Sequence, residues 1–192
     1  MDKLSNFFTL LKKPKAIILS GPDSRIIKET AERILGPHLK KDEDVLIVEN
    51  NLESTEEVKI ILQKSSFPVL VLNQTGEVSL EKIKALTEAM SGKGFLIVNS
   101  DEETIRQIRE MSPVPVLSFG FELRSDFYAS DIRINGGINF KINHKGSSVP
   151  IWLEKSKWEE KMTGALALVA IATVFGFNLV EISEALKTPD KA

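Results

Sequence analysis

Between residues 14 and 120, apolar positions alternate between short continuous runs and longer segments of helical spacing. The short runs, such as AIILS and VLIVE, are rich in β-branched residues and suit strands buried on both faces. The longer segments repeat apolar residues at helical spacing, which predicts helices with one buried face. Strands that alternate with helices predict a parallel sheet covered by helices. The predicted strands span residues 16–20, 45–49, 68–73, 94–99 and 115–120.

After Gly120 the pattern changes to strand-like runs separated by turns that contain glycine. FYASDIRI, INFKIN and VPIWL are joined by NGG and HKG, which predicts an antiparallel meander, expected as a small second sheet. Helical spacing returns over residues 157–175 and again around Ile182, with Asn178 as a capping residue. We therefore expect an α/β fold with a mostly parallel, P-loop-like (Rossmann-type) sheet, flanking helices and a small antiparallel β-meander. One domain is expected over residues 1–192, with the parallel part at 14–120, the meander at 121–155 and the C-terminal helices at 156–187.

Short polar motifs predict where individual helices begin. Ser54 with Glu57, and Ser100 with Glu103, have the spacing of a capping box, in which each side chain satisfies a free backbone donor. At the N-terminus, MDKLSNFFTLLKKPK has too short an apolar run and the wrong charge order for a secretory signal, so we expect a short helix.

The composition narrows the classes of partner. With 42% hydrophobic and 27% charged residues, the chain is an ordinary globular protein. A formal net charge of -2 gives no excess of cations for nucleic acid, which is not expected as a partner. The chain has no cysteine, so it has no disulfides, and a reducing cytoplasm fits. The apolar segment 162–177 is shorter than the roughly 20 residues that span a membrane, and a buried helix is expected there.

Several segments occur in the order found in one known family. LSFGFELRSD, the meander after it, the alanine-rich GALALVAIATVFGF and the final EISEAL resemble the second half of the Mur ligase central domain. AIILSGPDSRIIKETAERIL resembles that family's phosphate-binding ITGTNGKTTTKELL. The similarity extends from Leu4 to Lys187 and is greatest to the branch that adds D-alanyl-D-alanine to the UDP-muramoyl tripeptide. It implies the fold of that domain and a link to peptidoglycan precursor synthesis.

The same comparison shows what the phosphate-binding turn lacks. Such a turn needs glycines that expose backbone N–H groups, a lysine that reaches the phosphates and a hydroxyl that binds magnesium. Aligning GPDSRIIKE with GTNGKTTTK keeps Gly21, but places Ser24 at the second glycine, Arg25 at the lysine, and Ile26 and Ile27 at the hydroxyls. Isoleucine cannot bind a cation that requires oxygen ligands. Gly21, Ser24 and Arg25 predict either an anion site at the helix N-terminus or a plain turn whose polar residues cap the helix.

Other strand ends supply the remaining candidate residues. Glu49 ends VLIVE, where the resemblance implies a magnesium-binding carboxylate, although a solvated glutamate explains it as well. Asn99 and Asp101 match the family's N.DD residues near the nucleotide, and Asp101 equally suits the first turn of a helix. The family's histidine position falls near Val78, and its carbamylated lysine falls on Leu86.

Two further histidines and one further motif give no site. The family's GxHNxxN corresponds to WEEKMTG, in which none of the fixed residues is kept. His38 and His144 have no acid or histidine at ligand spacing, so both are expected at the surface.

The resemblance leads to two expected functions. The family's N- and C-terminal domains are expected to be absent, so ligation within this chain is not expected. The preferred function is a non-catalytic Mur ligase-like protein, a pseudoenzyme with no catalytic residue, that binds or assembles with a protein partner. The alternative is an ATP- or phosphate-binding subunit of an ATP-dependent amide ligase, which would use Mg-ATP, bind a nucleotide or UDP-sugar peptide, and need a partner chain. A stand-alone enzyme of other chemistry lacks a nucleophile–base pair in the sequence.

Overall fold

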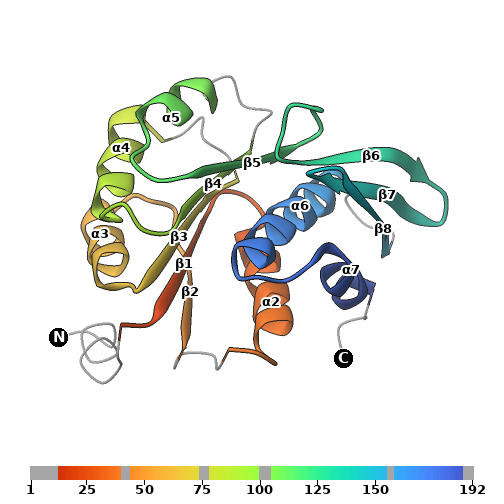
Figure 1. Ribbon diagram of the computed structural model, residues 1–192, viewed down its shortest axis with the longest axis horizontal. Coiled ribbons are helices and arrows are strands. Elements are labelled where there is room, and N and C mark those ends of the chain that lie inside the picture. The colour runs from red at the N-terminus through yellow and green to blue at the C-terminus, as the bar shows by residue number, and fades with distance from the viewer. Residues whose placement is uncertain (1–12, 40–43, 74–77, 100–104, 155–157, 188–192) are drawn as a thin grey trace.

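The computed structural model describes residues 13–39, 44–73, 78–99, 105–154 and 158–187. Its strands form one eight-stranded sheet in the order β2-β1-β3-β4-β5-β6-β7-β8 (Figure 1). The first six strands in that order, from β2 to β6, are parallel, and β7 and β8 are antiparallel to their neighbours. In chain order the strands are β1 (Lys15–Ser20), β2 (Val45–Glu49), β3 (Phe67–Leu72), β4 (Phe95–Asn99), β5 (Val116–Gly120), β6 (Phe127–Ile134), β7 (Gly137–His144) and β8 (Ser147–Glu154).

Helices cover the sheet on both faces. Figure 1 shows α3, α4 and α5 on one face, and α2, α6 and α7 on the other. The helices span α2 (Ser24–Leu35), α3 (Thr55–Lys64), α4 (Leu80–Ala89), α5 (Ile105–Met111), α6 (Trp158–Val174) and α7 (Leu179–Lys187). The predicted α/β class, with its parallel sheet, flanking helices and meander, is confirmed.

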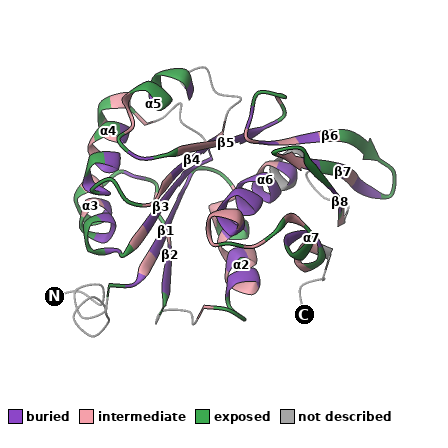
Figure 2. Ribbon diagram, viewed as in Figure 1, coloured by how far each residue is buried: buried purple, intermediate pink, exposed green. Residues whose placement is uncertain are grey.

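Along the central strands, successive apolar side chains point to opposite faces of the sheet and pack in two separate cores. In β1, Ile17 and Leu19 face the core shared with α2 and α6, whereas Ala16 and Ile18 face the core under α3 to α5. All four are at most 1% exposed, so β1 is buried on both faces, as parallel strands usually are. Figure 2 shows the buried residues running along the middle of the sheet.

Helix α6 is buried nearly all round because it lies between the sheet and its neighbouring helices. Its residues from Leu166 to Ala172 are at most 2% exposed, and the helix contacts β4, β5, β6, α2 and α7. This confirms the buried helix expected for that apolar segment. Across the described parts of the chain, no helix is long and apolar enough to cross a membrane.

The sequence predicted the meander as a small second sheet, and this prediction is wrong. Strand β6 pairs in parallel with β5 through Phe119 opposite Phe127 and Gly120 opposite Tyr128. The overlap is only two residues long, so a short loop can join two parallel strands that would otherwise need a long crossover. The meander therefore extends the parallel sheet, with β8 at its edge.

Two of the capping predictions can be compared with the structure. Asn178 caps α7 as predicted: its Oδ1 accepts from the N–H groups of Val180 and Glu181, both at 3.0 Å. Ser54 stands at the N-cap of α3, but its hydroxyl makes no capping hydrogen bond, so that capping box is wrong. The chain enters α3 through two other turns, in which Asn50 and Asn51 accept the N–H groups two residues on. The box at residues 100 and 103, and most of the expected N-terminal helix, lie outside the described residues.

Candidate functional site

The phosphate-binding segment suggested by the sequence is the turn between β1 and α2. Strand β1 lies between β2 and β3, and the helices that follow β1 and β2 cover opposite faces of the sheet (Figure 1). A parallel sheet has its usual ligand crevice at such a switch point, beyond the carboxyl ends of the strands. The turn therefore stands where an α/β protein can bind a ligand.

An open pocket of about 390 Å³ lies at this edge of the sheet. Three predicted site residues, Gly21, Ser24 and Glu49, line it together. Arg25 is not among them: its side chain is 82% exposed, and its Nε bonds the Glu29 carboxylate at 3.0 Å. The complete lining is Ser20, Gly21, Pro22, Ser24, Glu49, Asn50, Asn51 and Val78.

The turn is held by its own hydrogen bonds. Gly21 has a φ of 105° and Asp23 one of 63°, so the chain passes through the left-handed region twice before α2 begins. The Ser24 hydroxyl donates to the Gly21 carbonyl at 2.6 Å, and the Asn73 side-chain amide donates to the Pro22 carbonyl at 2.6 Å. Pro22 has no N–H to offer an anion. Asp23 occupies the N-cap position of α2 without a side-chain capping bond.

The two isoleucines at the family's hydroxyl positions have different surroundings. Ile27 is 2% exposed and packs in the core beneath α6, where a Cβ added at Gly164 would lie 3.5 Å from its Cγ1. Ile26 is 46% exposed and does not line the pocket. Neither side chain fills the pocket, and neither can offer oxygen to a cation.

One contact at the candidate site was missed by reasoning from the sequence. Lys28 of α2 forms an ion pair with Glu49, the candidate metal ligand, with Nζ 3.5 Å from Oε1. Lys28 lies one helical turn after Ser24, and residues four apart share a helix face. The signal was therefore present in the spacing of Ser24 and Lys28, opposite the end of β2.

Asn99, another predicted residue, belongs to a chain of hydrogen-bonded amides beside the turn. The Asn99 side-chain amide donates to the Asn73 carbonyl at 3.3 Å, and the Asn73 N–H donates to the Ser20 carbonyl at 2.9 Å. Asn99 is therefore linked to β1 through Asn73, but it does not line the pocket. Asp101 lies outside the described residues. Leu86, at the family's carbamylated lysine, is fully buried in the core.

His144 is partly buried, and not a fully exposed surface residue as the sequence led us to expect. Its ring stacks on Phe127 at a centroid distance of 3.9 Å, and its Nδ1 lies 2.7 Å from the Asp126 carbonyl oxygen. The contacts follow from the strand pairing, which brings the end of β7 beside the start of β6. His38 is exposed, with its ring edge against Phe177.

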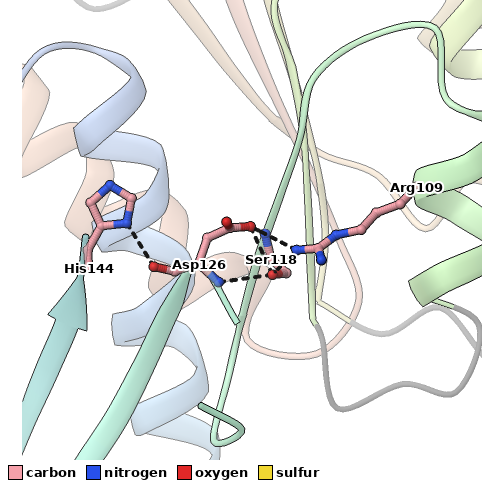
Figure 3. A network of polar contacts seen from close by, with 4 residues as sticks. All are labelled: Arg109, Ser118, Asp126 and His144. Atoms are coloured by element: carbon pink, nitrogen blue, oxygen red, sulfur yellow. Dashed lines mark hydrogen bonds and ion pairs between the residues drawn. The ribbon is translucent and has the colours of Figure 1, made fainter. Parts of the chain in front are cut away.

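A second polar cluster joins the parallel part to the meander (Figure 3). The Asp126 carboxylate accepts from the Ser118 N–H at 2.7 Å and from the Arg109 guanidinium at 2.9 Å. Arg109 also contacts the buried Ser118 hydroxyl, which in turn accepts from the Asp126 N–H at 3.0 Å. These bonds tie α5, β5 and the start of β6 together, so the cluster has a structural role. Within the described residues, no group of three histidines or acids could hold a metal ion.

Comparison with known proteins gives matches in sequence and in structure. No family model matches the chain. It is 33% identical over 97 residues to a UDP-N-acetylmuramate–L-alanine ligase of Streptococcus equi subsp. zooepidemicus, an alignment that covers 50% of this chain and 21% of the relative. The ligase of the same name from Streptococcus thermophilus is 33% identical over 94 residues, with 48% and 21% covered.

The structural matches extend over almost the whole chain. The UDP-N-acetylmuramoylalanyl-D-glutamyl-2,6-diaminopimelate–D-alanyl-D-alanyl ligase of Acinetobacter baumannii superposes with a TM-score of 0.76 at 19% identity, covering 97% of this chain and 48% of that one. The UDP-N-acetylmuramate:L-alanyl-gamma-D-glutamyl-meso-diaminopimelate ligase of Neisseria meningitides gives 0.70 at 12% identity, covering 98% and 69%. At these identities the likeness concerns the fold.

The layered, mostly parallel sheet, with a crevice at its switch point, defines the class as an α/β protein. The matched sequence and the shared fold then narrow the class: the chain is a relative of the Mur ligases and has the fold of their central domain, as its sequence suggested. The aligned segment spans about a fifth of the length of the curated relatives, and the chain covers about half of the first solved ligases that it matches.

Proposed function

We propose that this chain is a non-catalytic Mur ligase-like protein that acts in the cytoplasm as a binding or assembly module, with a protein partner, in peptidoglycan precursor synthesis. The observation that carries the proposal is the ion pair between Lys28 and Glu49 at the candidate metal position. The pathway is suggested by the names of the relatives, which are ligases of UDP-N-acetylmuramate.

The ion pairs around the turn support the proposal that this chain does not use Mg-ATP. A magnesium ion at Glu49 would have to compete with an ammonium group that already neutralises the carboxylate, 3.5 Å away. Both residues are only about one-third exposed, with side-chain values of 32% and 38%, so the attraction between them is screened less than at the open surface. Arg25, at the position of the phosphate-binding lysine, instead pairs with Glu29 on the exposed side of α2.

Thermal unfolding with added ligands tests the proposal. A ligand present at 100 times its dissociation constant stabilises the folded state by about 2.7 kcal/mol, which raises the Tm of a chain of this size by roughly 5–10 °C. We expect no such shift with Mg-ATP. A shift of that size, lost when magnesium is removed, would overturn the non-catalytic assignment.

An alternative function is an ATP- or phosphate-binding subunit of an amide ligase that needs a partner chain. The observation in its favour is the open pocket at the N-terminus of α2, lined by Gly21 and Ser24. Helix N-termini attract anions through their free N–H groups and dipole. This function predicts a shift with Mg-ATP or a UDP-sugar peptide that disappears in Arg25→Ala and Glu49→Ala, whereas the preferred function predicts the same unshifted Tm in all three proteins.

A further inference from the structure

The turn between β6 and β7 carries the one asparagine of the chain that is followed by glycine, Asn135 before Gly136. Strand β6 ends at Ile134 and β7 begins at Gly137, so these two residues make the tip of the hairpin. Both are exposed, and Figure 1 shows the tip projecting beyond α6. Solvent therefore reaches the Asn135 side chain and the Gly136 backbone.

The side-chain amide of Asn135 is not held by the fold. Two other exposed asparagines in turns are held: Asn51 accepts the Glu53 N–H at 3.1 Å, and Asn178 accepts the Val180 N–H at 3.0 Å. The Asn135 amide makes no hydrogen bond with any residue that the structure describes. It can therefore rotate toward the backbone that follows it without losing a bond.

The backbone nitrogen of Gly136 is equally accessible. The Asn135 N–H donates to the Gly137 carbonyl at 3.0 Å, whereas the Gly136 N–H donates to no acceptor in the described parts of the chain. A Cβ added at Gly136 would meet nothing within 4 Å, so the space around this residue is open. Glycine has no side chain to shield its nitrogen, and its backbone dihedrals change at little cost. The nitrogen can therefore approach the preceding side chain.

We propose that Asn135 is a modification site, at which the side-chain amide is lost without an enzyme and a carboxylate takes its place. The Gly136 nitrogen gives up its proton and attacks the side-chain carbonyl carbon of Asn135. The new C–N bond closes a five-membered succinimide ring, and the amide nitrogen leaves as ammonia. Water then opens the ring at either carbonyl, which gives aspartate or isoaspartate. Water is the only co-reactant, and no atom is oxidised or reduced.

The two products change the hairpin in different ways. Each adds a negative charge two residues after Arg133. Isoaspartate also adds one carbon to the main chain, at a tip that the Asn135 N–H closes by its bond to the Gly137 carbonyl. Gly137 packs closely on β8, where an added Cβ would lie 2.8 Å from the Leu153 carbonyl oxygen. Aspartate therefore alters the charge of the tip, and isoaspartate alters its closure as well.

Incubation of the full chain at mildly alkaline pH, which favours loss of the backbone proton, tests the proposal. Trypsin cleavage after Arg133 and after Lys141 releases residues 134–141, a peptide that contains both Asn135 and Asn139. Mass spectrometry of this peptide shows which asparagine has become an acid, and chromatography separates the aspartate form from the isoaspartate form. We expect both forms at Asn135, with Asn139 unchanged.

Two comparisons separate the effect of the turn from that of its sequence. Asn51 and Asn178 are exposed but must first leave a hydrogen bond, so we expect Asn135 to react roughly tenfold or more faster than either. The second comparison is the same chain unfolded in urea. We expect the rate at Asn135 in the folded chain to stay within roughly tenfold of its unfolded rate, because no hydrogen bond of its amide has to break.

A pair of alanine variants tests the role of the glycine. In Gly136→Ala a methyl group shields the attacking nitrogen, and we expect conversion at Asn135 to slow by roughly tenfold. Gly146→Ala, in the β7–β8 turn, is the matched control. The two glycines have φ values of 71° and 79°, and a Cβ at either meets nothing within 4 Å, so both variants carry similar strain. Gly146→Ala should leave the rate at Asn135 unchanged.

The proposal is overturned if Asn135 in the folded chain reacts no faster than Asn51 and Asn178, or if the two alanine variants react at the same rate. The site contains no residue that lines the pocket at Gly21. Its outcome is therefore independent of the Mg-ATP experiments that decide the proposed function.

Discussion

The two ends of the sheet differ in how their polar side chains are used. At the β1–β2 end, the charged residues around the turn pair with one another, Lys28 with Glu49 and Arg25 with Glu29. At the β6–β8 end, the side chains of Arg133 and Trp152 are exposed on the meander. The fold matches that of solved Mur ligases across both ends, yet the carboxylate expected to bind a metal, Glu49, is paired with Lys28. Fold and site chemistry can therefore change independently.

The variant with the largest expected effect disrupts the joint between the two ends of the sheet, which is the pairing of β5 with β6. Phe127 is fully buried where β6 meets β5, and it stacks on His144. Phe127→Ala should lower the free energy of unfolding by about 3–5 kcal/mol, because a large cavity opens in the core. Urea denaturation measures this loss. Leu123→Ala, at a position 78% exposed in the adjoining loop, is the control and should cost less than about 0.5 kcal/mol. Equal losses in the two variants would mean that Phe127 does not hold the joint.

A pair of glycines tests the tight packing of the parallel end. A Cβ at Gly94 would lie 1.7 Å from the Pro68 carbonyl oxygen, whereas a Cβ at Gly92 meets nothing within 4 Å. Both have a φ near +74°, with values of 76° and 72°, so both alanine variants carry the same left-handed strain of about 1–2 kcal/mol. Gly94→Ala should lose roughly 1–3 kcal/mol more, from the clash alone. Denaturation curves that coincide would contradict the tight strand spacing.

The cluster in Figure 3 tests the polar part of the joint. Asp126→Asn removes the charge that accepts from Arg109 and from the Ser118 N–H. We expect a loss of about 1–3 kcal/mol in the free energy of unfolding, because the neutral amide loses the attraction between the carboxylate and the Arg109 guanidinium and keeps only one oxygen as an acceptor. Glu110→Gln, on the exposed side of α5, is the matched control. If the control costs as much, the cluster is not what joins α5 to the meander.

The smallest expected effect concerns the charge pair between Lys141 and Asp131 on the meander. The hydrogen bond from Lys141 lowers the pKa of Asp131, so their contact stabilises the fold at neutral pH and loses this contribution as the pH falls through the folded-state pKa. Lys141→Gln should return the pKa of Asp131 toward its usual value of 3.8. A carboxyl NMR titration measures the change. The same titration curve in the wild type and the variant would show that the pair does not form in solution.

Most of the fold could be predicted because its determinants are local. β2 matches its predicted range, β1, β4 and β5 differ from theirs by one residue at one end, and β3 is shifted by one residue. The runs of β-branched residues fix these positions without reference to the rest of the chain. The single sheet could not be predicted in this way, because it depends on Phe119 meeting Phe127, a contact between residues that the loop brings together.

The sequence predicted part of the candidate site, because some of its residues follow from local motifs and others depend on contacts with neighbouring elements. Motif positions placed Gly21, Ser24 and Glu49 together, and the structure brings them into one pocket. The direction of the Arg25 side chain and the pairing of Lys28 depend on neighbours on the helix surface, which position-by-position comparison with a motif does not consider. The exposure of Trp152 could not be predicted either, because it follows from the register of β7 and β8.

The central claim is that Glu49, the candidate metal ligand at the β1–β2 end, is already paired with Lys28 and does not hold Mg-ATP. Isothermal titration calorimetry of the purified chain with ATP, with and without magnesium, tests it most directly. We predict a dissociation constant weaker than about 1 mM, or no measurable heat, in both conditions. A micromolar dissociation constant that requires magnesium and is lost in Glu49→Ala would contradict the claim.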